Sequence, residues 1–216
     1  IYSSQGDADQ AIENLKRAIA LQPEDPELNS TLGIELFHNG DLDEAVEYLE
    51  KTLTQDPNST STLTMLGNAY NKKGDYKLAI SYYKQVLELD PSEAVSHYNM
   101  GNALQAKGSI RAAIENYAKA LKIKPIYAEA HTNMGVALKE NGDLTAAIKS
   151  HKESLKIDPN CAEIYNNMGN ALSDNCDHEA AINNYNQAIK IKPDYADAYA
   201  NLGFSQRNSG DLEAAI

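Results

Sequence analysis

The chain has 216 residues, and 31 acidic against 19 basic side chains give it a formal net charge of −12. This excess of acid argues against a nucleic-acid or anionic-membrane surface, because both need clustered lysine and arginine. No stretch approaches the roughly 18 consecutive apolar residues of a membrane-spanning helix, and no secretory signature is visible, so we expect a cytoplasmic protein.

The chain consists of copies of one repeated sequence unit. Proline recurs every 34 residues at Pro23, Pro57, Pro91, Pro125, Pro159 and Pro193. Glycine keeps the same interval at Gly33, Gly67, Gly101, Gly135, Gly169 and Gly203. A second glycine series starts at Gly6 and is interrupted only by Cys176. A fixed period of this length indicates a stacked array of small structural units.

The register of the repeat defines the copies. We number positions 1–34 so that the first glycine series lies at position 8. Residues 1–25 are then an incomplete copy, in which we expect a helix over 8–21. Five full copies and an incomplete last one follow, at 26–59, 60–93, 94–127, 128–161, 162–195 and 196–216.

Each copy predicts two antiparallel helices, as residues 128–161 illustrate. Apolar and small residues recur at helical spacing over 128–141 and again over 144–157. Between them, Asn141-Gly142-Asp143 supplies a left-handed turn and a cap for the second helix. Asp158-Pro159 then ends that helix, because the residue before a proline disfavours helical backbone.

Two positions require a specific explanation. Gly135 lies inside a helix, where glycine costs roughly 1 kcal/mol against alanine. We expect it to face Ala147 and to let the two helices approach closely, with Gly169 and Ala181 as the equivalent pair. Cys176 replaces a turn glycine, so we expect it to adopt left-handed backbone at a cost of about 1 kcal/mol.

No enzyme motif is present, and we expect neither catalysis, nor a cofactor, nor a metal site. His97 and His131 are one repeat apart at a packing position, which favours core histidines over a metal pair. Cys176-Asp177-His178 has no identifiable helper base. Cys161 and Cys176 would lie about 22 Å apart along a helix, so we expect free thiols.

The pattern resembles the tetratricopeptide repeat (TPR) family. The copy at 162–195 carries its signature at Tyr165, Met168, Gly169, Leu172, Ala181, Tyr185, Ala188 and Pro193. The resemblance covers the whole chain. It implies an all-α, right-handed superhelical solenoid of antiparallel helix pairs, a single TPR array over residues 1–216. It also implies a protein-interaction scaffold whose first helices line a concave groove.

Asparagine recurs at position 6 of the first helix in four consecutive copies. It is a middling helix former, but its amide can bond both groups of a peptide backbone. The series is similar to the asparagine ladder in the TPR region of O-linked N-acetylglucosamine transferases. We therefore expect an extended peptide to bind along Asn68, Tyr98, Asn99, Asn102, Asn133, Asn166, Asn167, Asn170 and Asn201. The acidic residues at position 2 would favour a basic partner.

Three alternatives stay open at the level of sequence. Asparagine is also a common soluble residue that need not bind anything. The array could be the substrate-recruiting arm of a larger glycosyltransferase-like enzyme. It could also be a self-assembly module that stacks end to end, with Ile12, Leu15 and Ile19 bare at one end and Leu202 and Phe204 only partly covered at the other.

Overall fold

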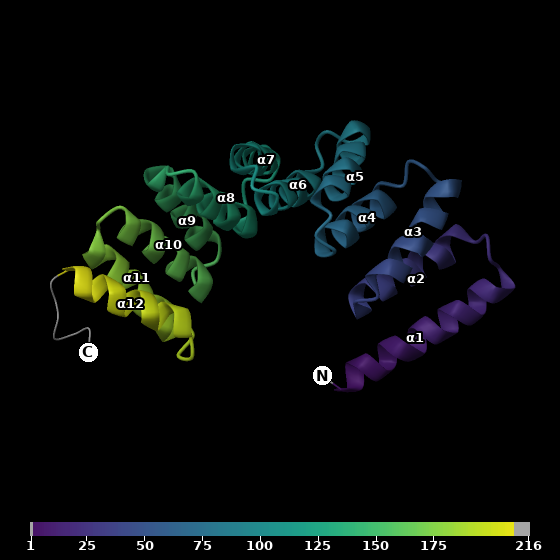
Figure 1. Ribbon diagram of the computed structural model, residues 1–216, viewed down its shortest axis with the longest axis horizontal. Helices are drawn as coiled ribbons and strands as arrows, with labels where there is room; N and C mark the ends of the chain where they lie inside the picture. Colours follow the sequence, from purple (N-terminus) through teal and green to yellow (C-terminus); the bar gives the residue numbers. More distant parts are fainter. Residues whose placement is uncertain (1, 210–216) are drawn as a thin grey trace. The chain divides into compact units, whose positions relative to one another are not determined.

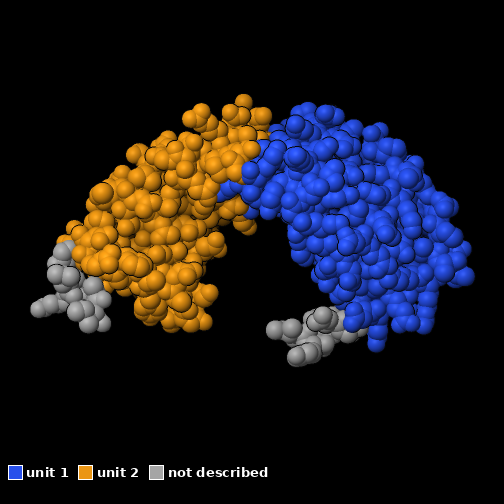
Figure 2. Space-filling model, in the orientation of Figure 1, with its two compact units in different colours: residues 1–107 blue, residues 108–216 orange. Residues whose placement is uncertain are grey.

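The computed structural model describes residues 2–209, and side chains from residue 8 onward. The described residues form twelve α-helices and no strand. The chain divides into two compact units, residues 1–107 and 108–216, which are coloured separately in Figure 2. The predicted all-α fold of consecutive helix pairs is confirmed.

Each unit holds six helices. Those of the first unit are α1 (Tyr2–Leu21), α2 (Pro26–Asn39), α3 (Leu42–Gln55), α4 (Thr60–Lys72), α5 (Tyr76–Leu89) and α6 (Ala94–Ala106). Those of the second are α7 (Ile110–Ile123), α8 (Ala128–Glu140), α9 (Leu144–Ile157), α10 (Ala162–Asp174), α11 (His178–Ile191) and α12 (Ala196–Ser209). Within each unit, successive helices pack side by side (Figure 1).

The helix boundaries follow the capping residues of the repeat. Asp25 caps α2, and its Oδ1 accepts from the backbone N–H of Glu27 at 2.9 Å. Asp143 caps α9 in the same way, accepting from Ala146 N–H at 3.0 Å. These bonds satisfy donors that the first turn of a helix leaves unpaired. The predicted helix pair is observed in the full copies that lie within one unit, 26–59, 60–93, 128–161 and 162–195.

The turns between paired helices use left-handed backbone. Gly40 and Gly142 have φ angles of 99° and 86°, where a side chain is disfavoured. Cys176 has a φ of 60° at the equivalent place, as predicted. Gly6 differs from these glycines because it lies inside α1, which starts at Tyr2 rather than at the expected residue 8.

The glycine at position 8 makes room for a side chain of the second helix. A Cβ added to Gly135 would lie 2.5 Å from Cε1 of His151, and one added to Gly169 would lie 2.5 Å from Cε1 of Tyr185. The expected close approach is confirmed, but the nearest atoms belong to these rings rather than to the predicted partners, Ala147 and Ala181. The ring lies one helical turn further along the second helix, at position 24.

The expectation about bare apolar residues is half wrong. Ile12 and Ile19 of α1 are buried against Leu32 and Leu36 of α2, with Leu15 partly buried beside them. The helix that starts the array therefore covers its own apolar stripe by packing on the next helix. At the other end of the described residues, Phe204 of α12 is 57 % exposed.

Candidate functional site

The asparagines gather on the first helix of each pair. Positions 6 and 9 are three residues apart, so their side chains lie next to each other on one helix face. Within the described residues, every asparagine at these two positions is partly buried. They are Asn68 on α4, Asn99 and Asn102 on α6, Asn133 on α8, Asn167 and Asn170 on α10, and Asn201 on α12. Tyr98 of α6 is also partly buried.

In the first unit, Asn68 is the centre of a hydrogen-bond network. Its Oδ1 accepts from the Tyr83 hydroxyl at 2.7 Å and from Nδ2 of Asn99 at 3.1 Å. Burial raises the pKa of Tyr83, so the phenol keeps its proton and remains a donor. The network links α4, α5 and α6, and it fixes the orientation of the Asn68 amide.

The second unit repeats this arrangement with one change. The Tyr185 hydroxyl donates to Oδ1 of Asn170 at 2.9 Å, and burial raises the pKa of Tyr185 to about 12. Nδ2 of Asn201 donates to Oδ1 of Asn166 at 3.0 Å. Asn166 itself is only 5 % exposed. It therefore positions Asn201 rather than facing outward, because position 5 points toward the helix packing.

Several amide groups keep no protein partner among the described residues. They are Nδ2 of Asn68 and Asn170, Oδ1 of Asn99 and Asn201, and the whole amide of Asn167. The free groups at position 9 are donors, and those of Asn99 and Asn201 at position 6 are acceptors. A face with both kinds of group can bond both the C=O and the N–H of an extended chain.

Position 2 of the first helix carries an exposed acidic side chain in four copies. Glu27, Glu129, Glu163 and Asp197 all lie on the surface at this position. A partner with basic side chains would therefore be favoured over an acidic one.

The residues that the sequence offered as metal or catalytic candidates have structural roles. Nε2 of His97 lies 3.3 Å from the Pro91 carbonyl, and Nε2 of His131 lies 3.1 Å from that of Pro125. Asn29 bonds the Pro23 carbonyl from the same position at 3.0 Å. In these three copies, the side chain at position 4 thus bonds the linker that precedes the first helix. Asp177 caps α11 by accepting from Ala180 N–H.

The thiols of Cys161 and Cys176 are both free. In residues 2–209, no group of three or more metal-ligating side chains comes together. No helix in that range is both long and apolar enough to cross a membrane.

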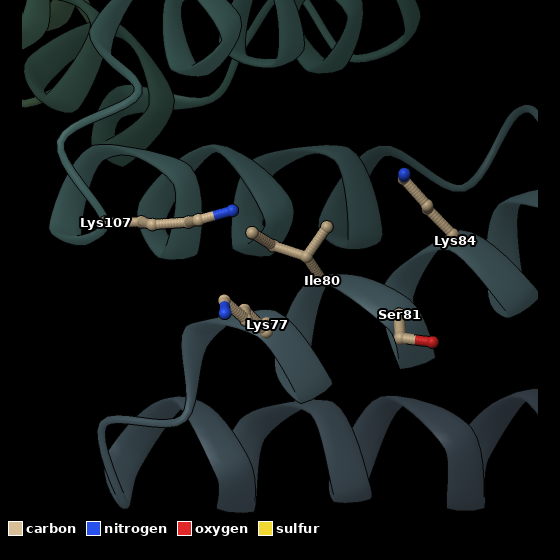
Figure 3. A pocket seen from close by; sticks show the side chains of 5 residues that line it. All are labelled: Lys77, Ile80, Ser81, Lys84 and Lys107. Carbon is tan, nitrogen blue, oxygen red and sulfur yellow. The ribbon is translucent and has the colours of Figure 1, made fainter.

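A basic depression on the first unit was not anticipated from the sequence. Lys77 and Lys84 of α5 and Lys107 after α6 surround Ile80 and Ser81, as Figure 3 shows. The space measures 230 Å³. None of the three lysines pairs with a carboxylate among the described residues. Only the packing of α5 beside α6 brings them together, and that packing cannot be read from their spacing.

Comparison with known proteins identifies the repeat. The model of the cytochrome c-type biogenesis protein H TPR domain matches residues 1–96. The TPR repeat model matches residues 101–142, 137–175 and 177–210. No curated protein sequence matches the chain significantly.

Solved structures share the fold. A crystal structure of MamA protein is 26% identical, with a TM-score of 0.71 over 79% of this chain and 93% of MamA. YrrB, described as a TPR protein with an unusual peptide-binding site, is 23% identical, with a TM-score of 0.70 over 88% of this chain and 97% of YrrB. PilF of Pseudomonas aeruginosa is 19% identical, with a TM-score of 0.76 over 88% of this chain and 86% of PilF.

Proposed function

The chain belongs to the tetratricopeptide repeat family, and from this membership we propose that it binds an extended segment of a partner protein along its first-helix face. TPR arrays are protein-interaction scaffolds. What carries the finer proposal is the set of amide groups without a protein partner, which includes Nδ2 of Asn68 and Asn170 and the amide of Asn167. None of these atoms is buried, so each is open to a ligand that can bond it.

The fixed amides explain why asparagine would suit this task. Because Tyr83 and Tyr185 hold Oδ1 of Asn68 and Asn170, each amide already has a fixed orientation before a partner arrives. Such preorganisation lowers the entropy that binding must offset. An extended peptide advances about 3.3 Å per residue, so consecutive amides would meet its backbone only every few residues. Side-chain specificity would then be loose, with a preference for basic segments.

The test uses a linear peptide selected against the chain from a random library. Changing Asn99, Asn133, Asn167 and Asn201 together to alanine should weaken its binding by about 2–6 kcal/mol if the terms add, at 0.5–1.5 kcal/mol per net hydrogen bond. Isothermal titration would measure this loss, and circular dichroism would check that the helices remain.

A matched control exists on the second helices. Asn183 and Asn186 of α11 are exposed and lie at positions 22 and 25, away from the first-helix face. Their change to alanine should leave the affinity unaltered. A second control is the same peptide with N-methylated backbone amides, which should bind more weakly. A folded quadruple variant that binds undiminished would reject the proposal.

A further inference from the structure

A groove on the second unit lies between α7, α8 and α9. Its volume is 450 Å³. Its walls are mostly apolar and include Ala118 and Leu121 of α7, Met134 and Leu138 of α8, and Ala146 of α9. No asparagine lines the groove, so it is separate from the first-helix face that carries the asparagines of positions 6 and 9, here called the asparagine face.

The equivalent place in the first unit is filled by the chain itself. Tyr70 and Tyr82 lie at positions 11 and 23 of the copy at 60–93, and their rings stack with centroids 5.6 Å apart and planes at 11°. Both rings pack against the buried cluster that includes Leu66 of α4, and Leu53 of α3 packs against the same cluster. The Tyr70 hydroxyl donates to Glu50 at 3.2 Å.

In the groove, each of these large side chains is replaced by a smaller one. Leu138 takes the place of Tyr70, Ser150 that of Tyr82, and Ala118 that of Glu50, while Leu121 and Met134 keep the apolar floor. The groove is therefore the space that aromatic rings occupy in the other unit. An aromatic ring matches its apolar walls, and ring burial is a large stabilising contribution in protein interfaces.

The rim of the groove is positive although the chain is acidic. Lys122 and Lys149 line it, and neither pairs with a carboxylate among the described residues. The one acidic lining residue, Glu153, is paired with Lys156 at 2.7 Å. That hydrogen bond, and after it the charges of Lys156, His131 and Lys149, holds the pKa of Glu153 below its usual range. The two unpaired lysines thus favour a negative group beside the ring.

We propose that this groove binds an aromatic side chain of a partner protein, with a carboxylate next to that side chain in the partner. The ring fills the space that Tyr70 and Tyr82 fill in the first unit, and Lys122 and Lys149 attract the carboxylate. This second docking site takes a segment with an aromatic and an acidic side chain. The asparagine face instead favours a segment with basic side chains. The two proposed sites use different residues, so an experiment can reject one proposal without affecting the other.

The experiment uses 3-phenylpropanoate as a probe, because it carries one ring and one carboxylate. Methyl resonances of Ala118, Met134 and Ala146 should shift on titration, with millimolar affinity. The uncharged probe 3-phenylpropanamide should bind more weakly. Changing both rim lysines, Lys122→Glu and Lys149→Glu, should reverse the preference, because two carboxylates would repel the acid probe and leave the amide unaffected.

Two variants fill the groove from within. Ser150→Tyr introduces the residue found at position 23 of the copy at 60–93, and Ala146→Leu introduces that of position 19. Each should weaken probe binding by about tenfold or more. The matched control is Asn184→Tyr, at position 23 of the next copy, which should leave binding intact. Ala146→Leu serves the same purpose if Ser150→Tyr fails to fold.

Three results would overturn the proposal. The first is the absence of methyl shifts in the groove with the acid probe. The second is undiminished binding by a folded groove-filling variant. The third is equal binding of acid and amide by the unaltered chain, which would remove the carboxylate from the recognised group.

Discussion

At the scale of single residues, positions 9 and 24 vary together. Asparagine accompanies tyrosine at Asn68 with Tyr83, at Asn102 with Tyr117, and at Asn170 with Tyr185. Ile34 accompanies Leu49 instead, and Val136 accompanies His151. The two bonds of 2.7 and 2.9 Å explain the pairing, because a buried phenol needs an acceptor. His151 has none: it is fully buried, and neither ring nitrogen has a hydrogen-bond partner.

We therefore predict that the double change His151→Tyr and Val136→Asn stabilises the chain. It restores the tyrosine–asparagine pair of the other copies, which should add about 1 kcal/mol to the free energy of unfolding at neutral pH. The single change His151→Tyr should gain less, because its hydroxyl would face Val136. Urea denaturation of the single and double variants gives the coupling energy, and a coupling of zero would contradict the pairing.

The same variants should differ in their pH dependence. Burial lowers the pKa of His151 from 6.5 to about 4, so between these values the unfolded chain binds a proton that the folded chain does not. The stability that His151 contributes in neutral form is fully present above pH 6.5 and is lost as the pH falls toward 4, at about 1.4 kcal/mol per pH unit. The double variant should lack this part of the loss.

At the scale of secondary-structure elements, the turn before α11 has the least favourable backbone conformation of the turns within helix pairs. Cys176 has a φ of 60°, whereas Gly40, Gly74, Gly108 and Gly142 occupy the same turn without a side chain. Changing Cys176→Gly should raise the free energy of unfolding by about 1 kcal/mol. The opposite change at the preceding copy, Gly142→Ala, should lower it by a similar amount. Thermal melts of the two variants should move in opposite directions.

Sequence reasoning reached the elements better than the contacts between them. The 34-residue period and the turn at Asn141-Gly142-Asp143 predict the helix pairs, because backbone conformation there depends on local residue type. The ring beside Gly135 was missed because spacing along a helix says which face a residue shares, but not which residue of the other helix meets it. The pairing of positions 9 and 24 was visible in the sequence and would have identified that contact.

The candidate site shows the same limit. The period predicted that Asn99 and Asn201 lie on the same face of their own helices, α6 and α12. The burial of Asn166, by contrast, depends on how α10 packs on its neighbours. Likewise, the groove beside Ala146 is visible only once α7 and α9 both pack on α8. Residues that act within one helix could be predicted, whereas residues whose role depends on the packing between copies could not.

At the scale of the whole molecule, the described contacts within each unit run only between near neighbours. Within each unit, every helix contacts helices one or two places away in the chain. The stability of such an array is approximately a sum of repeat terms and interface terms. A defect in one copy should therefore lower protection near that copy and leave distant helices unaffected.

Gly169→Ala provides such a defect. The added Cβ would lie 2.5 Å from the Tyr185 ring, and overpacking of this kind costs about 1–3 kcal/mol, more than the helix propensity that alanine gains. Hydrogen exchange should then show lost protection in α10 and α11 and unchanged protection in α2 and α3. Gly203→Ala is the control, because no described atom lies within 4 Å of its added Cβ, and it should stabilise α12. Equal loss across both units after Gly169→Ala would instead mean that the array unfolds as one cooperative body, because only then would the cost be shared by helices that do not touch it.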